Sequence, residues 1–379
     1  MEPGKPQVVT VAPDRPVTFA VAVAHREPLV TVEPTGAWAL LMEDEQRWRR
    51  WSARVPADLP FREAVVRSLL TLRLLTYSPS GAPVAAPTTS LPEQYGGMRN
   101  WDYRFAWPRD ASIGIAAFLN VGMVDEARSF LWWLLHASRL ERPRLPVLLT
   151  LDGRRSPTER DLRGWPGYAA SVPVRVGNGA AEQHQLDGYG WVVDAACVLV
   201  EAGHPLYSET WRAIRGFTDL VARRWSEPDA GIWEVRGDEA HHVHSKLMGW
   251  LALDRALRIS RTHRLSSRQR LRWQSARNML GDDIRNRGYD PRAGTYTRSY
   301  GSPDLDAALL VLPLIGLDAP DSPFVRGTIE AIRRDLGAGG PLLYRYPPGR
   351  DGLPGTEGAF LPCSFWLVQA LSLTGRSAE

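Results

Sequence analysis

GMRNWDYRFAWPRD, residues 97–110, is the most informative stretch of this sequence. It combines aromatic rings with three arginines and two aspartates in one short run. A sugar binds to such a set, because its C–H face stacks on aromatic planes and its hydroxyl groups need fixed donors and acceptors. An amphipathic element with a buried aromatic face and a solvated face of ion pairs has the same composition. Composition alone leaves both interpretations open.

The bulk composition predicts a globular protein. The 379 residues are 44% hydrophobic and 23% charged, enough for one large domain or two ordinary ones. The net charge is only +4 and there is no dense basic run, so we expect no nucleic-acid partner. No apolar run reaches the roughly 20 residues of a membrane span, and residues 1–6 lack a signal-peptide pattern. Cys197 and Cys363 lie in apolar surroundings and are predicted to be free, buried thiols, which fits a cytoplasmic location.

Helical periodicity dominates the sequence from Phe61 onward. The predicted helices are Ala64–Tyr77, Ser112–Val121, Asp125–Ser138, Leu186–Ala202, Tyr207–Ser226, Lys246–Arg261, Ser267–Arg287, Leu305–Leu317, Pro323–Leu336 and Cys363–Thr374. This length gives room for about twelve helices of ordinary size. Because no short solenoid repeat is present, a closed helical toroid is favoured over an open array.

The residues before Phe61 follow a different pattern. Short runs rich in valine, threonine and proline predict strands at Gln7–Val11, Val17–Val23 and Leu29–Val32. The charge- and tryptophan-rich run from Glu43 predicts a linking helix.

A family resemblance rests on residues 100–104 (NWDYR) followed by residues 107–110 (WPRD). These strings resemble the signature of glycoside hydrolase family 15, the glucoamylase and trehalase-like enzymes. The resemblance extends over residues 38–376 and implies a mainly α fold, an (α/α)6 barrel preceded by a β-sandwich. Here most of the sandwich is missing. The implied domains are a sandwich remnant over residues 1–36, a linker helix over 37–60 and a catalytic barrel over 61–379. Self-association or a separate β-sandwich partner would follow from the missing domain.

Hydrolysis of a glycosidic bond needs two carboxyl groups, but the sequence has 42 acidic residues, so spacing alone does not select the pair. Glu234 lies in GIWEVRG, whose apolar neighbours would raise its pKa as a general acid requires. From the residues alone, a surface glutamate on a turn is the alternative. Glu357 lies in TEGAF and could equally be a charge that caps a helix N-terminus. The resemblance implies that Glu234 is the general acid and Glu357 the general base, with Thr356 where many relatives have a second glutamate.

The resemblance also implies a set of sugar-binding residues. Arg109 and Asp110 match the pair that holds the hydroxyl groups of a terminal glucose, against the alternative of a weak ion pair at a helix start. Pro108 replaces the more usual leucine and would fit a first helical turn. The expected stacking platforms are Trp101 and Trp233. Further polar candidates by matching segments are Asn178, Gln185, Asp187 and Lys246.

Three histidines, His241, His242 and His244, invite a metal hypothesis. A strand-like spacing would place His242 and His244 on one face. No third ligand is evident nearby in the sequence, and the family resemblance implies a mechanism without metal. No metal and no cofactor are therefore expected.

The implied function is that of an inverting exo-acting α-glucosidase. It would release β-glucose from the non-reducing ends of short α-glucans or oligosaccharides, with its two carboxyl groups roughly 6.5–9.5 Å apart. An α,α-trehalase shares these motifs and is the alternative within the family. A non-catalytic sugar-binding relative is the alternative from another class. The loops that distinguish the two enzyme branches carry no readable signal in the sequence.

Overall fold

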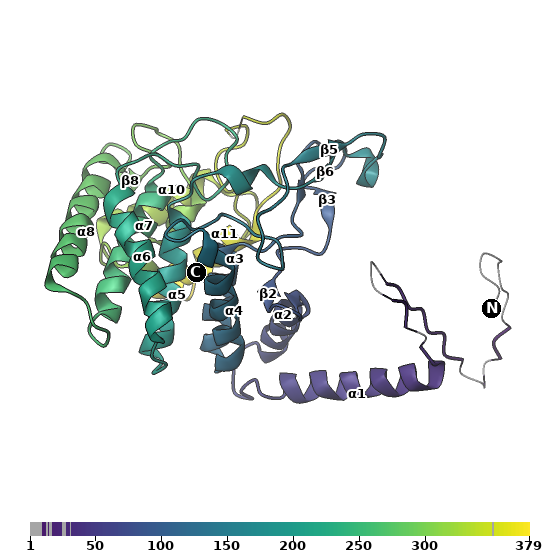
Figure 1. The fold of residues 1–379 in the computed structure, drawn as a ribbon. Helices are drawn as coiled ribbons and strands as arrows, with labels where there is room; N and C mark the ends of the chain where they lie inside the picture. Colours follow the sequence, from purple (N-terminus) through teal and green to yellow (C-terminus); the bar gives the residue numbers. More distant parts are fainter. Residues whose placement is uncertain (1–9, 13, 15–16, 25–27, 31, 351) are drawn as a thin grey trace. The chain divides into compact units, whose positions relative to one another are not determined.

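The computed structural model describes residues 10–12, 14, 17–24, 28–30, 32–350 and 352–379. Its contacts divide the chain into two units, residues 1–70 and residues 71–379 (Figure 1). Within the described residues, no helix combines the length and the apolar character needed to cross a membrane.

The first unit contains helix α1 (Pro34–Ser52) and the start of α2 (Arg62–Leu74), which crosses the boundary between the units. The Glu33 side chain caps α1 by accepting a hydrogen bond from the Gly36 amide at 2.9 Å. Pro34 lies in the first turn of α1. Backbone N–H groups there have no carbonyl partner within the helix, so a proline costs no hydrogen bond. An ion pair between Arg49 and Glu45 adds support one turn apart along the helix, at 2.6 Å.

The strands expected before α1 are absent from the described residues. Val17–Val23 forms no strand, and neither do Leu29, Val30 and Val32, while residues 7–9 and 31 lie outside the described residues. The described residues thus form none of the expected strands, and the domain assignment of residues 1–36 stays a prediction. A strand is stable only when a neighbour pairs with its backbone N–H and C=O groups, and an alternating sequence does not supply that neighbour.

The second unit holds the other helices and all the strands that the described residues form. Its α-helices are α3 (Pro108–Asn120), α4 (Val124–Ala137), α5 (Asp187–Glu201), α6 (Ser208–Arg224), α7 (Val243–Ile259), α8 (Ser267–Arg287), α9 (Leu312–Ile315), α10 (Pro323–Asp335) and α11 (Leu361–Leu373). Its 3-10 turns are η1 (Ser138–Leu140), η2 (Tyr168–Ala170), η3 (Gly179–Glu182) and η4 (Ala307–Val311). Four antiparallel two-stranded ribbons join β1 (Thr76–Tyr77) with β2 (Ala82–Pro83), β3 (Thr89–Pro92) with β4 (Asn100–Asp102), β5 (Arg160–Leu162) with β6 (Val174–Val176), and β7 (Tyr289–Asp290) with β8 (Thr295–Tyr296).

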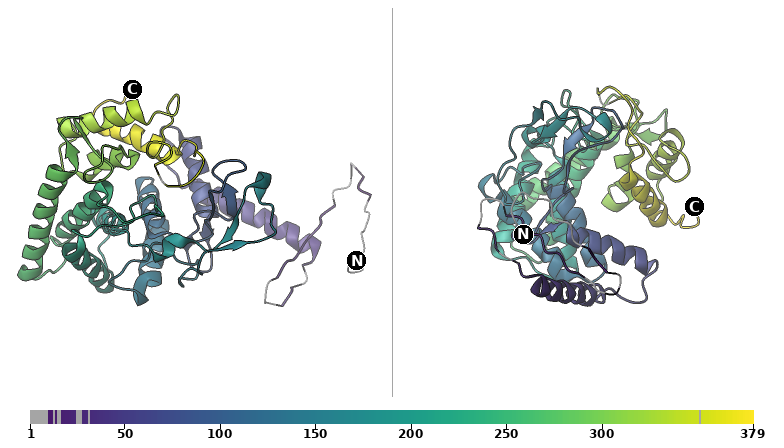
Figure 2. Two further views of the ribbon diagram at one scale, coloured as in Figure 1. Left: turned by 90° about the horizontal axis from the view of Figure 1, so that it is seen from above. Right: turned by 90° about the vertical axis from the view of Figure 1, so that its right-hand side faces the viewer.

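The helices of the second unit pack in an inner and an outer row (Figures 1 and 2). In the inner row α5 packs against α3 and α7, α7 reaches η4 and α9, and these contact α11. In the outer row α4 packs against α3, α6 and α8 against α7, and α10 against η4. The rows differ in sequence character, because α7 is buried on nearly all sides while α6 and α10 have one buried and one polar face.

Periodicity predicted nine of the ten helices to within a few residues, and the tenth differs. Leu305–Leu317 was expected as one helix, but it forms the 3-10 turn η4 followed by the short α9. Pro313 explains the break, since it has no N–H to donate to a carbonyl four residues earlier. Gly316 then ends α9 in the left-handed conformation. Helix α3 begins at Pro108, four residues earlier than predicted.

Candidate active site

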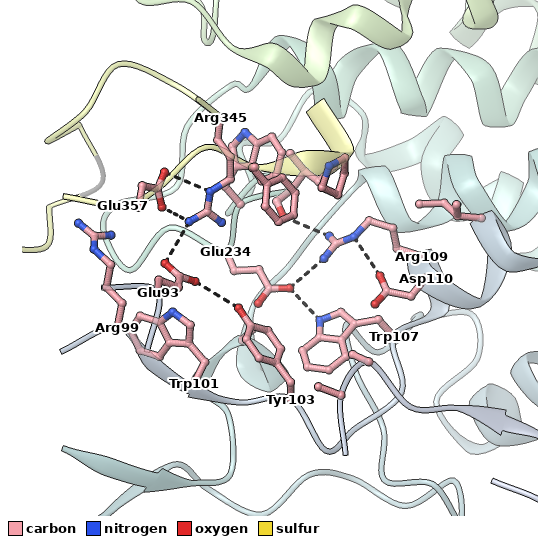
Figure 3. Close-up of a pocket in the computed structure, with 18 of the residues that line it drawn as sticks. Glu93, Arg99, Trp101, Tyr103, Trp107, Arg109, Asp110, Glu234, Arg345 and Glu357 are labelled. Carbon is pink, nitrogen blue, oxygen red and sulfur yellow. Dashed lines mark hydrogen bonds and ion pairs between the residues drawn. The ribbon is translucent and has the colours of Figure 1, made fainter. Parts of the chain in front are cut away.

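A cavity of about 850 Å³ lies within the second unit, beside the N-terminal halves of α3 and α11 (Figure 3). Its size is that of a pocket for a small molecule. Loops that precede α7 and α11, the first turn of α3 and the β3–β4 ribbon supply its walls. The charged and aromatic lining residues are Glu93, Arg99, Trp101, Tyr103, Trp107, Arg109, Asp110, Trp233, Glu234, Arg236, Arg345, Tyr346, Glu357, Phe360, Phe365 and Trp366.

Arg109 stands in the first turn of α3 and links three groups around the cavity. Its Nη2 lies 3.1 Å from Oε1 of Glu234, and its Nη1 donates to the Ile232 carbonyl at 3.1 Å. Nη1 also lies 3.6 Å from Oδ2 of Asp187, which is fully buried at the start of α5. Burial raises the pKa of Asp187 and the Arg109 charge opposes that rise. Arg109 is therefore a structural cation as much as a ligand group.

Asp110 is the more accessible member of the Arg-Asp pair. Its Oδ1 lies 3.7 Å from Nε of Arg109, and 41% of its side chain remains exposed. It also lines the cavity. A carboxylate in this position can accept hydrogen bonds from two sugar hydroxyl groups while Arg109 holds its orientation.

Glu234 projects into the cavity from the loop before α7 (Figure 3). Its Oε1 accepts hydrogen bonds from Trp107 Nε1 at 2.8 Å and from Arg109 Nη2 at 3.1 Å. Its backbone adopts a φ of 58°, a strained conformation for a residue with a side chain. The apolar surroundings inferred from sequence are thus only part of its environment. Both hydrogen bonds go to Oε1, so Oε2 can carry a proton without losing either.

Trp233 is held by an acidic residue that the sequence analysis did not single out. Its Nε1 donates to Oδ1 of Asp306 at 2.8 Å, and the same oxygen accepts from the Ala308 amide at 2.8 Å. The indole lies among three further rings, those of Tyr346, Phe360 and Trp366. Burial raises the pKa of Asp306, and the hydrogen bonds that it accepts oppose this. The Trp233 ring is consequently fixed before any ligand arrives.

Glu357 faces the cavity from the loop before α11, where Arg345 binds it (Figure 3). Nε of Arg345 lies 3.2 Å from Oε1 of Glu357, and Nη2 donates to Oε2. Nη2 also lies 3.4 Å from Oε2 of Glu93, whose other oxygen accepts a hydrogen bond from the Tyr103 hydroxyl at 3.4 Å. Burial alone would lower the Arg345 pKa, but the hydrogen bonds to Glu357 raise it above its ordinary value. Glu357 therefore belongs to a charged cluster and does not stand alone.

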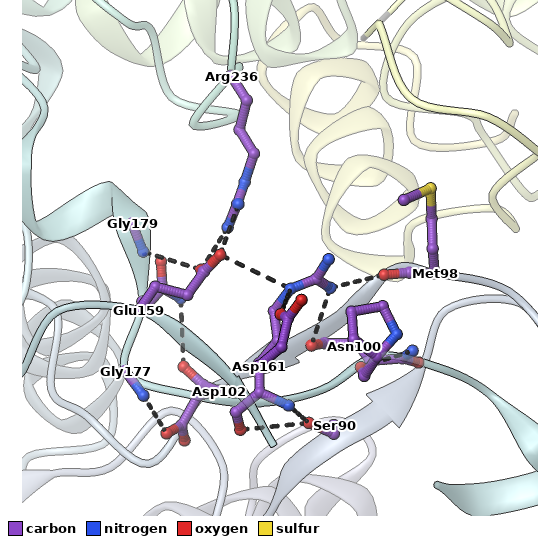
Figure 4. A network of polar contacts seen from close by, with 12 residues as sticks. Ser90, Met98, Asn100, Asp102, Glu159, Asp161, Gly177, Gly179 and Arg236 are labelled. Carbon is purple, nitrogen blue, oxygen red and sulfur yellow. Dashed lines mark hydrogen bonds and ion pairs between the residues drawn. The ribbon is translucent and has the colours of Figure 1, made fainter. Parts of the chain in front are cut away.

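Trp101 lines the cavity but its ring already contacts two cations. The guanidinium carbons of Arg175 and Arg236 lie 4.6 and 4.2 Å from the ring centroid. Both arginines are held by Glu159, whose Oε1 is 2.7 Å from Nη1 of Arg236 and 3.6 Å from Nε of Arg175 (Figure 4). A sugar that stacks on Trp101 would have to compete with these guanidinium groups.

Asn100 and Asp102, the neighbours of Trp101, form hydrogen bonds with backbone groups (Figure 4). Oδ2 of Asp102 accepts from the Gly177 amide at 3.0 Å. Nδ2 of Asn100 donates to the carbonyls of Gly97 and Pro173, at 3.0 and 3.2 Å. The two buried side chains thus hold the β5–β6 region against the β3–β4 ribbon.

Residues 60–378 match the sequence pattern described as glycosyl hydrolases family 15. The chain belongs to this family. It is 39% identical to a trehalase of Mycolicibacterium smegmatis over 87% of its own length and 50% of the relative's. It is 40% identical to a trehalase of Mycobacterium tuberculosis (86% and 48%) and 36% identical to one of Thermoplasma acidophilum (89% and 57%). The chain thus spans about half the length of these curated relatives.

Solved structures share the fold at low sequence identity. A glycosidase variant in complex with glucose superposes with a TM-score of 0.64 at 22% identity, covering 83% of this chain and 80% of that one. A glucoamylase from Saccharomycopsis fibuligera gives 0.59 at 16% identity, covering 83% and 72%. These likenesses and the two rows of helices confirm the mainly α, (α/α)6 fold class predicted from the family 15 resemblance.

The structure separates the four remaining binding candidates. Asn178 lines the cavity, although its side chain bonds the Ala180 amide at 3.0 Å and the Asp102 carbonyl at 3.2 Å. Two candidates, Gln185 and Asp187, are not among the residues that line the cavity, and both lie behind Arg109, at 3.4 and 3.6 Å from its Nη1.

Lys246 was expected to face the pocket, and this is wrong. It is fully buried in α7, where its Nζ donates to the carbonyls of Trp225, at 2.6 Å, and Glu227. Helix α7 is buried on nearly all sides, so the matching sequence segment did not indicate whether Lys246 faces the cavity or the protein core. The Lys246 ammonium group instead hydrogen-bonds the carbonyls that follow the C-terminal end of α6. Burial lowers the pKa of Lys246.

Sequence reasoning missed several charged and aromatic cavity residues, including Glu93, Tyr103, Trp107 and Arg345. Tyr103 and Trp107 lie inside the quoted motif, where Tyr103 alternates with the charged residues Asp102 and Arg104. Glu93 and Arg345 are 252 residues apart, and nothing local marks either one.

The histidine cluster forms no metal site within the part of the chain that the structure describes, where no three His, Cys, Asp or Glu residues are placed to hold an ion. Burial lowers the pKa of His242 to about 4 and that of His244 to about 3, so both rings are neutral near pH 7. His241 stacks on Tyr300 instead. The two cysteines are free and buried, as predicted.

We expect Asp229 to make the stability of the fold pH-dependent. It is buried, accepts a hydrogen bond from the Leu186 amide at 2.8 Å, and burial raises its pKa from 3.8 to about 7. The native state therefore binds a proton more tightly than the unfolded state, and stability is lost as pH rises toward 7. Between pH 5 and pH 8 this loss should be about 2–3 kcal/mol. Urea unfolding at both pH values should show it in the wild type and not in D229N. Equal pH dependence in the two proteins would contradict the assignment.

Proposed function

We propose that this chain carries the active site of an inverting glycoside hydrolase whose substrate is α,α-trehalose. The trehalase alternative is favoured over the glucoamylase-like interpretation because relatives described as trehalases are 36–40% identical over most of the chain. The observation that carries the catalytic part is the oriented Glu234, which shares a cavity with a second carboxylate group on Arg345.

The proposed reaction assigns one step to each side of the cavity. Glu234 gives its proton to the glycosidic oxygen as the bond to the anomeric carbon breaks. Glu357 takes a proton from a water molecule whose oxygen attacks that carbon from the opposite face. To do so, Glu357 must be released in part from its hydrogen bonds with Arg345. The products are one glucose inverted to β and one that keeps its α configuration.

Substrate binding is proposed to use groups that are already fixed. Asp110 would accept hydrogen bonds from the hydroxyl groups of the terminal glucose, and the anchored Trp233 would contact its apolar face. Such preorganisation lowers the entropic cost of binding.

The test is glucose release by the purified chain from trehalose, maltose, isomaltose and maltotetraose, with the anomers followed by proton NMR. We expect trehalose to react fastest and to give equal amounts of α- and β-glucose before mutarotation. Faster release of β-glucose from the maltose series would support the glucoamylase-like alternative instead. Sugar binding without release from any substrate would indicate the non-catalytic alternative and contradict the proposal.

A further inference from the structure

Two segments far apart in sequence meet at one side of the cavity. The β3–β4 connection contacts the loop that carries Glu357, because Oε1 of Gln94 accepts from the Thr356 amide at 3.1 Å. Nη2 of Arg99 lies 3.3 Å from the Leu353 carbonyl. The approach is close at Gly355, where a Cβ atom would stand 2.5 Å from the Gln94 side chain. These contacts hold Glu93 and Glu357 at fixed places around Arg345.

Arg345 is shared unequally between the two carboxylate groups. Glu357 makes two contacts with it and Glu93 makes one, at 3.4 Å. The side chains are mostly buried, with 15% of Arg345 and 23% of Glu93 exposed. Arg345 offers one positive charge to two carboxylates in so little water, and Arg99 adds only a smaller effect on Glu93. Nη2 bonds both groups, so a stronger hold on one weakens its hold on the other.

Four groups act on the charge of Glu93. Burial raises its pKa, Arg345 lowers it, and Glu357 raises it. Smaller effects come from Arg99 and from the hydrogen bond of Tyr103, which both lower it. The pKa of Tyr103 is itself raised by burial, so its hydroxyl keeps its proton and can donate to an ionised Glu93.

We propose that Glu93 is a positioning residue of the active site, which acts through Arg345 to set how firmly Glu357 is held. When Glu93 is protonated, Arg345 pairs with Glu357 alone. When Glu93 is ionised, it competes with Glu357 for Nη2 of Arg345. The hydrogen bond from Nη2 to Oε2 of Glu357 is then weaker. Glu357 is then better able to accept a proton from water. This inference rests on the proposed function, but its physical core, the coupling of the two carboxyl groups, is independent of activity.

The coupling can be measured without any substrate. In protein labelled with ¹³C at the glutamate carboxyl carbons, the resonance that E93Q lacks is that of Glu93. We expect its titration midpoint to lie above the ordinary value of about 4.3. Removal of the neighbouring charge in E357Q should lower the midpoint by about one pH unit. Y103F should raise it, which provides a second test if E357Q does not fold.

Glu239 provides the matched control, since it is an exposed glutamate remote in sequence from both segments. E239Q should leave the Glu93 midpoint unchanged. A Glu93 midpoint that responds neither to E357Q nor to Y103F would overturn the proposal.

The effect on catalysis is read from the pH profile. E93Q mimics the protonated residue, so kcat should fall about tenfold while KM changes little. The acidic limb of the wild-type kcat profile should contain the ionisation of Glu93 in addition to that of the general base Glu357, and E93Q should lose only the Glu93 step. A merely structural role would lower activity without changing this limb, so an unchanged profile shape would overturn the proposal. If the wild type releases no glucose, the proposed function fails, and the NMR titration still decides the coupling.

Discussion

Replacing Glu234 with glutamine is expected to slow glucose release from trehalose by a factor of about 10²–10⁴. The amide has the shape of the carboxyl group, so its oxygen can keep the hydrogen bonds from Trp107 and Arg109 that hold the side chain. It cannot give a proton to the departing oxygen. The loss should therefore appear in kcat, with KM nearly unchanged. Initial rates over a range of trehalose concentrations measure both constants.

A substrate that needs no proton on its leaving group isolates the acid step. Glucosyl fluoride releases fluoride unaided, so E234Q should retain most of its activity on this compound. E239Q changes an exposed glutamate five residues away and should behave as the wild type on both substrates. Normal trehalose turnover by both E234Q and E357Q would rule out the proposed mechanism.

Replacing Arg109 with methionine is expected to remove activity and to lower the free energy of unfolding by about 3–5 kcal/mol. Arg109 is the cation beside the fully buried Asp187, at 3.6 Å, and it also holds Glu234 at 3.1 Å. Without it, Asp187 must either carry an uncompensated charge or take up a proton. Urea unfolding followed by circular dichroism measures the loss at pH 7.

A double variant separates the two roles of Arg109. R109M/D187N removes both charges, so most of the stability should return while activity stays low, because Glu234 still lacks its donor. R154M removes an arginine from an exposed ion pair with Asp152 and should change stability by less than about 0.5 kcal/mol. If R109M is as stable as the wild type, Arg109 does not compensate the Asp187 charge.

Local patterns in the sequence predicted what local physics controls. The helices follow from apolar residues at helical spacing, and the two wrong predictions of secondary structure have one local and one non-local cause. Pro313 breaks the expected helix over Leu305–Leu317, and Val17–Val23 has no partner strand in the described residues. The motif around Arg109 and the Trp233–Glu234 pair likewise pointed to residues that line the cavity.

The sequence did not predict which residues that are distant in the chain contact one another. Lys246 lies two residues after His244 in a matching segment, yet the packing of α7 turns it to the carbonyls of Trp225 and Glu227. Asp306 was not a candidate from the sequence, and only the folded chain brings its carboxylate to the Trp233 indole N–H.

The sequence by itself determined the helical fold class, the family and one wall of the site, since each depends on residues close together in the chain. The tertiary structure alone decided which charges share a neighbour. Arg345 meets Glu93 across 252 residues, and Arg109 meets Glu234 across 125. Electrostatic pairing depends on distance in space and on burial, and neither quantity is encoded locally in a sequence of charges.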